Sequence, residues 1–158
     1  MSTLFPTWPH ILFAVLEPLS LLAGFFGALL DTSNFISGQT SHAGNPPSHP
    51  SVLALTYQLG NLYLLLAILG VFTVYTASEP RVLRNYLIAL AIGDVGHIYA
   101  TYVAMGASGF RDVATWSPVA WGNIAVTGFL LVNRIAYLLG VFGYPLNPRQ
   151  KEGGPKVE

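Results

Sequence analysis

The sequence predicts an all-α membrane protein, a bundle of four transmembrane helices that encloses a polar pocket. The first observation is composition: of 158 residues, 53% are hydrophobic and only 9% are charged, against about 25% charged in soluble proteins. The second is four apolar stretches, each long enough to cross about 30 Å of hydrocarbon as a helix of roughly 20 residues. The third is the lack of an alternating pattern typical of barrel strands, so helices must satisfy the backbone in lipid.

The four spans follow one another in a single domain of residues 1–143. We place them at residues 9–30, 52–76, 82–105 and 118–143. The first is interpreted as a retained span, because no basic region precedes it and no small-residue cleavage site follows a short apolar core. The polar connection 31–51, rich in Ser, Gly and Pro, predicts a loop. Pro80 suits the first turn of the third helix and Pro118 that of the fourth.

Basic residues predict the orientation of the chain. Arg81 and Arg84 flank the second connection, and three more basic residues lie in the tail 144–158. The opposite side carries only Arg111, beside Asp112. The positive-inside rule then places both termini in the cytosol. We expect a disordered polar tail and, for a small multispan chain without a transit peptide, a location in the endoplasmic reticulum.

Composition also narrows the chemistry. Because there is no Cys, disulfides and thiolate metal sites are excluded. A net charge of zero without a basic run argues against nucleic acid as a partner. Glu17, Asp94 and His97 could supply metal ligands, but their spacing is not Glu-x-x-His and no second pair exists. We therefore expect no metal and no cofactor; the expected partners are the lipid bilayer and a lipophilic small molecule, and a homo-oligomer stays open.

Four ionisable side chains lie inside the expected spans: Glu17, Asp94, His97 and Arg134. A centred charge costs about 2.5–3.5 kcal/mol on insertion scales, so these groups need partners or a purpose. At 1.5 Å per residue, Glu17 and Arg134 both lie roughly 12–13 Å from the cytosolic edge and can meet. Asp94 lies roughly 18 Å deep, and His97 is one turn above it on the same helix face.

Uncharged polar and aromatic residues are expected in the same band. They are Tyr57, Asn61, Tyr99, Trp121 and Asn123. We expect them to bind substrate and position water, although asparagines such as Asn61 and Asn123 more often form hydrogen bonds between helices. Arg134 is interpreted as an orienting counter-ion, and the third-span glycines Gly93 and Gly96 would let another helix approach closely.

Two carboxyl groups beside one arginine can supply an acid and a base. The guanidinium favours the ionised form of one carboxyl group, and burial favours the neutral form of the other. The acid could protonate an epoxide, an ether or an alkene, and the base could activate water or an internal hydroxyl group. Glu17 and Asp94 are thus the proposed acid and base, in either order, with His97 and Arg134 tuning and orienting them.

Several motifs carry a family resemblance. They are Pro9-x-x-x-Phe13-x-x-x-Glu17-Pro18-x-Ser20, Gln58-Leu59-x-Asn61-Leu62-Tyr63, Gly93-Asp94-x-Gly96-His97-x-Tyr99, Trp121-Gly122-Asn123 and Arg134. Over residues 6–143 the chain resembles small four-span fungal membrane proteins of secondary-metabolite clusters, including epoxide hydrolases of the aurovertin and citreoviridin type. That resemblance implies acid-catalysed opening of a polyene epoxide by water or by an internal hydroxyl group. The residue types are also similar, by convergence, to the limonene-epoxide hydrolase arrangement, which implies roles for Tyr57 and Asn61 beside the charged groups.

Two alternatives stay open. The chain is loosely similar to four-span sterol isomerases of the emopamil-binding type, which implies an isomerase or terpenoid cyclase that protonates an alkene. The ring faces of Trp121, Tyr99 and Phe13 could then stabilise a carbocation. The other alternative is a non-catalytic scaffold or lipid-binding protein, in which the polar band only holds the helices together.

Overall fold

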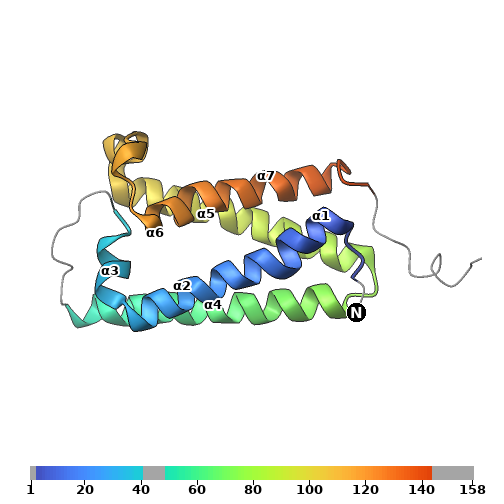
Figure 1. The fold of residues 1–158 in the computed structure, drawn as a ribbon, viewed down its shortest axis with the longest axis horizontal. Helices are drawn as coiled ribbons and strands as arrows, with labels where there is room; N and C mark the ends of the chain where they lie inside the picture. Colours follow the sequence, from blue (N-terminus) through green and yellow to red (C-terminus); the bar gives the residue numbers. More distant parts are fainter. Residues whose placement is uncertain (1–2, 41–48, 144–158) are drawn as a thin grey trace, which may run out of the picture.

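The computed structural model describes residues 3–40 and 49–143, which form helices and connecting turns without a strand. The helices lie one after another along the chain (Figure 1). Their bounds are α1 Thr7–Pro9, η1 His10–Leu16, α2 Glu17–Leu30, α3 Thr32–Ser37, α4 Pro50–Thr76, α5 Pro80–Arg111, η2 Val113–Thr115, α6 Pro118–Trp121, η3 Gly122–Val126 and α7 Thr127–Leu138. The predicted all-α class is confirmed.

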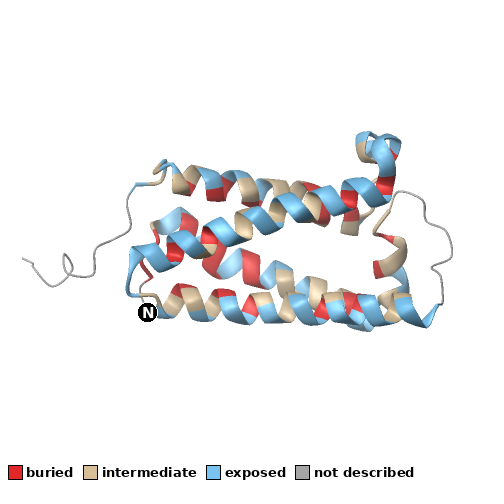
Figure 2. Ribbon diagram, turned by 180° about the vertical axis from the view of Figure 1, so that it is seen from behind, coloured by how far each residue is buried: buried red, intermediate tan, exposed pale blue. Residues whose placement is uncertain are grey.

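Four continuous helical stretches are long and apolar enough to cross a membrane. They are Thr7–Leu30, Pro50–Thr76, Pro80–Arg111 and Pro118–Leu138. Large apolar side chains on each of them are exposed, among them Leu30, Phe72, Ile92 and Val132, and Figure 2 shows the exposed outer faces of the helices. Such extensive apolar surface suits a lipid bilayer rather than water. The protein therefore has the architecture of a multi-pass membrane protein.

Three predicted boundaries differ from the structure. The connection after the first span is not entirely a loop, because α3 occupies Thr32–Ser37; residues 41–48 lie outside the described residues, as does the predicted tail 144–158. The third helix leaves helical geometry at Gly106, with φ of +71°, close to the predicted end, but then continues to Arg111. The fourth ends at Leu138 and not at residue 143, and Gly140 follows with φ of +80°.

The spans associate as two pairs, α2 with α4 and α5 with α7. The chain start, the α4–α5 connection and the end of α7 lie at one end of the bundle, whereas α3 and α6 lie at the other (Figure 1). The two pairs meet near the first of these ends, where one apolar cluster contains residues from all four spans. Its members are Leu4, Phe5, Leu12, Phe13, Ala14, Val74, Leu83, Leu87, Leu130 and Tyr137.

Gly60 lets α2 and α4 approach closely. Gly60, Ala67 and Gly70 are buried on one face of α4; of these, Gly60 faces α2, whereas Gly70 faces Tyr86 of α5. A Cβ atom on Gly60 would lie 3.1 Å from the Cβ of Ala28 in α2. In lipid, where burial of apolar surface gives little driving force between helices, such close backbone packing stabilises the pair.

A π-helical segment prepares the position of Glu17. Pro18 has no N–H and would leave a carbonyl unpaired in an α-helix. In the structure η1 precedes the proline, and the N–H of Glu17 bonds the carbonyl of Leu12, five residues earlier. The hydrogen-bond register thus changes directly before the proline. π-Helical segments are rare and frequently lie at functional sites.

Candidate functional site

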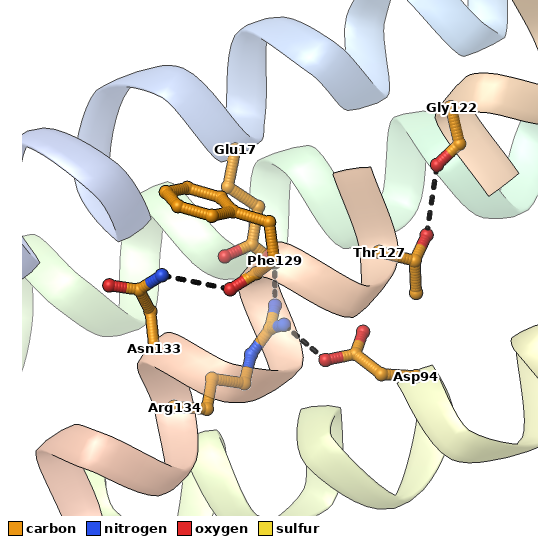
Figure 3. A network of polar contacts seen from close by, with 7 residues as sticks. All are labelled: Glu17, Asp94, Gly122, Thr127, Phe129, Asn133 and Arg134. Atoms are coloured by element: carbon orange, nitrogen blue, oxygen red, sulfur yellow. Dashed lines mark hydrogen bonds and ion pairs between the residues drawn. The ribbon is translucent and has the colours of Figure 1, made fainter. Parts of the chain in front are cut away.

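Arg134 lies at the centre of the polar site and joins three helices. Its Nη2 donates to Oε1 of Glu17 at the start of α2, and its Nη1 donates to Oδ2 of Asp94 in α5. Both contacts are ion pairs. Figure 3 shows the guanidinium group between the two carboxyl groups. The structure thus brings together three of the four predicted catalytic residues. In the chain, Glu17 lies 117 residues and Asp94 lies 40 residues before Arg134. We call these three residues the Arg134 centre.

The Arg134 centre is almost entirely buried. Arg134 is 1% exposed and Glu17 is 6% exposed, while the Asp94 side chain keeps 12% of its surface. Charges in such a medium are costly unless they are paired and hydrogen-bonded. Pairing is incomplete: among the described residues, Oε2 of Glu17 and Nε of Arg134 are buried without a hydrogen-bond partner.

Aromatic and amide side chains support the arginine. The ring of Phe13 lies under the guanidinium, with the Cζ atom 5.5 Å from the ring centroid, a cation–π geometry. Asn133, the neighbour of Arg134, accepts a hydrogen bond of 2.9 Å from Nε1 of Trp8 and donates to the carbonyl of Phe129. These contacts fix the first helical stretch against α7 and hold Glu17 beside Arg134.

A second polar cluster lies beyond the Arg134 centre, toward α3 and α6. Nε2 of His97 is 3.2 Å from Oδ1 of Asn123, and Nδ2 of Asn123 donates to Oε1 of Gln39 at 2.8 Å. Since an amide oxygen only accepts, Nε2 of His97 carries the hydrogen. Asn123 lies in η3, the second π-helical segment. His97 therefore pairs with an amide and not with Asp94, one turn away on its own helix.

Gln39 and Asn133 are polar residues that sequence reasoning missed; Gln39 is the one that lies outside the predicted spans. It lies in the connection after α3, outside every span, so span analysis carried no signal for it. The short helix α3 positions it, and Ser117 holds the same connection by donating to the carbonyl of Gly38. The Ser117 oxygen also accepts the N–H of Ala120 and caps α6.

The structure does not bring Tyr57, Asn61, Tyr99 or Trp121 to the Arg134 centre. All four are exposed; Tyr99 is 66% exposed and Tyr57 is 47% exposed. Tyr57 and Asn61 lie one position after the buried Thr56 and Gly60, and one residue turns a helix by about 100°. The side chains of Tyr57 and Asn61 therefore point away from the buried face of α4. The four residues thus do not contribute to the Arg134 centre, and their substrate-positioning roles stay predictions.

Around Gly93 and Gly96, no atom of another described element lies within 4 Å of a Cβ built on either residue. The expected close approach of another helix is therefore not seen among the described residues. Among the described residues, no group of three His, Cys, Asp or Glu residues could hold a metal ion.

Two open grooves are lined by none of the three residues of the Arg134 centre. One of about 340 Å³ is lined by Val95, Ile98, Tyr99, Tyr102, Phe110 and Leu131. The other, of about 250 Å³, is lined by Phe35, Ile36, Gln39, Val52, Leu55, Thr56 and Leu59. Neither corresponds to the expected enclosed polar pocket, because the charged groups are packed against one another and against Phe13.

Comparison with known proteins adds a family but no activity. One family model, described as a domain of unknown function (DUF7704), matches residues 2–144, which include all four spans. No curated protein and no solved structure matches the chain. Any function must therefore be argued from the geometry of the site.

Proposed function

Since the chain belongs to the DUF7704 family, whose function is unknown, we propose a function from the Arg134 centre itself. The protein is a membrane enzyme that opens the epoxide of a lipophilic polyene or polyketide intermediate by acid–base catalysis, as a hydrolase or a cyclase. One observation carries the proposal: two carboxyl groups share one buried guanidinium group inside the bundle. The sequence resemblance to four-span epoxide hydrolases of fungal secondary metabolism supports the substrate class.

The reaction needs one proton donor and one proton acceptor. A neutral carboxyl group donates its proton to the epoxide oxygen while a carbon–oxygen bond of the ring breaks. Water, or a hydroxyl group of the same substrate, attacks that carbon and gives its proton to the other, ionised carboxyl group. A diol or a cyclic ether results, and transfer of the proton between the carboxyl groups restores the enzyme. General acid–base catalysis of this kind contributes about 10²–10⁴-fold.

The other polar residues take supporting roles. Arg134 holds both carboxyl groups in place and compensates the charge of the ionised one. The hydrogen-bonded row His97, Asn123 and Gln39 offers amide and imidazole groups that can position oxygen atoms of the substrate. Entry of a substrate requires α2 and α7 to separate near Phe13, because the centre is closed by packed side chains.

The isomerase or terpenoid cyclase has less support. Of the three aromatic residues expected to stabilise a carbocation, Tyr99 and Trp121 are exposed, and the ring of Phe13 already faces Arg134. The scaffold alternative is favoured by one specific observation, namely that neither groove is lined by a residue of the Arg134 centre. In that case the ion pairs would serve only to join α2, α5 and α7.

The test uses microsomes that contain the protein and a lipophilic polyene epoxide in heavy-oxygen water. Hydrolysis gives a labelled diol, cyclisation gives an unlabelled cyclic ether, and alkene isomerisation gives an unlabelled product that keeps the epoxide. Asp94→Asn and Glu17→Gln should each lose turnover while they stay folded. Full turnover by both folded variants would exclude the proposed mechanism.

Location and orientation form part of the proposal. The α4–α5 connection lies at the same end of the bundle as the chain start and the end of α7 (Figure 1). Arg81 and Arg84 follow this connection, at the start of α5. A cytosolic position of this end, in the endoplasmic reticulum membrane, agrees with the positive-inside rule. Protease protection in sealed microsomes, with tags at each terminus and in the α5–α6 connection, tests it.

A further inference from the structure

The charges of the Arg134 centre do not balance. Arg134 brings one positive charge, and Glu17 and Asp94 bring two negative charges if both are ionised. The only ion pairs among the described residues are the two within this centre. His97, the nearest histidine along α5, bonds to Asn123. A buried charge without a counter-charge costs several kcal/mol in a protein interior, which favours a neutral centre. With one arginine and two carboxyl groups, the centre is neutral only when it holds one proton.

The surroundings of the two carboxyl groups are unequal. Glu17 is buried, and its Oε2 atom has no hydrogen-bond partner among the described residues. An ionised carboxylate has about four acceptor positions, and leaving one oxygen bare in an apolar medium is costly. Asp94 keeps 12% of its side-chain surface, and its free oxygen is not among the buried atoms that lack a partner. Asp94 therefore tolerates the negative charge better.

We propose that Glu17 holds this proton on Oε2 and that Asp94 is the ionised partner of Arg134. Neutral Glu17 is then a buried O–H donor without an acceptor, held in place because its Oε1 atom accepts from Arg134. The ligand that this position takes is one with a hydrogen-bond-accepting oxygen, such as an epoxide, ether or carbonyl group on a lipophilic molecule. In the proposed reaction this makes Glu17 the acid and Asp94 the base, and this assignment rests on the proposed function. The location of the proton on Glu17 does not rest on it.

Infrared spectroscopy of the purified full chain at neutral pH tests the location without any substrate. The carbonyl stretch of a neutral carboxylic acid is separate from the bands of carboxylates. Cell-free synthesis with glutamate labelled with ¹³C at the side-chain carboxyl group should shift this band to lower frequency, and labelled aspartate should leave it in place. The other acids among the described residues, Asp31, Glu79 and Asp112, are exposed.

Glu17→Gln keeps the shape of neutral glutamic acid and serves as the matched variant; it should lose the band. Two results would overturn the proposal: a band that shifts with labelled aspartate instead, which would place the proton on Asp94, or the lack of any neutral-acid band. The second result would place the balancing charge elsewhere, for example on His97. A glutamate-dependent band in a protein that turns over no epoxide would uphold the proton on Glu17 and reject the proposed function.

Discussion

Replacement of Arg134 by Gln removes the one positive charge that Glu17 and Asp94 share. The glutamine is shorter, neutral and unable to bridge the two carboxyl groups as the guanidinium does. Removing one partner of a buried ion pair typically costs about 3–5 kcal/mol, because the other charge is left buried and uncompensated. Arg134 is 1% exposed, so water cannot take its place without opening the bundle.

We therefore expect Arg134→Gln to lower the free energy of unfolding by about 3–5 kcal/mol, a large part of the roughly 5–15 kcal/mol of a typical domain. Most of this loss should disappear when the carboxyl groups are removed too. In the apolar triple variant, Glu17→Met, Asp94→Leu and Arg134→Met, no charge remains in the centre. Replacing buried ion pairs by apolar residues of similar volume is often neutral or stabilising by about 1–4 kcal/mol.

The assay is reversible unfolding in detergent micelles, followed by circular dichroism and by tryptophan fluorescence. Trp8 is a useful probe because it bonds to Asn133, next to Arg134. Arg111→Gln is the control, since Arg111 is exposed at the end of α5 and should change stability by no more than about 0.5 kcal/mol. If Arg134→Gln proves as stable as Arg111→Gln, the two ion pairs do not hold the helices together and the argument from burial is refuted.

Three further changes probe the rest of the fold, each followed by the same unfolding assay. Gly60→Leu should lower the free energy of unfolding by about 1–3 kcal/mol through overpacking, because a Cβ at this position already approaches Ala28 to 3.1 Å. Gly128→Leu, where nothing lies within 4 Å of the added Cβ, should show no such loss. Equal losses in the two variants would contradict the close packing of α2 on α4. Asn123→Ala should lower the free energy of unfolding by about 1–3 kcal/mol, since His97 and Gln39 both lose a hydrogen-bond partner. An unchanged unfolding midpoint would mean that this cluster contributes nothing to stability. Ser117→Ala should lower the free energy of unfolding by about 0.5–2 kcal/mol, because the side-chain cap of α6 is lost. Ser117→Thr keeps a hydroxyl group and should retain most of the stability. Similar losses in both variants would count against capping.

Depth in the membrane is the part of the site that the sequence could supply. Position along a helix fixes depth at 1.5 Å per residue, and the meeting of Glu17, Asp94 and Arg134 follows from three such depths. The approach of Asn123 to His97 follows in the same way. The four spans themselves follow from length and composition alone.

Rotation about the helix axis could not be predicted in the same way. A lipid-facing helix such as α4 is apolar on every side, so no hydrophobic stripe marks its inner face. Position along α4 therefore leads to the prediction of Tyr57 and Asn61 at the site, whereas both side chains are exposed. The small residues Gly60, Ala67 and Gly70 mark the inner face, and their spacing is a signal that could have fixed the rotation.

Local backbone features were the other gap. Nothing in the span pattern predicts the π-helical segment η1 directly before Glu17 and Pro18. Gln39 reaches Asn123 only because α3 folds within a connection that is polar in sequence. In both cases a tertiary arrangement overrides what local composition indicates.

Turnover of a lipophilic polyene epoxide by the apolar triple variant tests the central claim most directly, because this variant separates catalysis from stability. If the Arg134 centre is the catalytic site, the variant folds with an unfolding midpoint close to that of the native chain but loses turnover, by about 10²-fold or more. A folded triple variant that turns over the epoxide at the native rate would contradict the claim and leave the centre with a structural role alone.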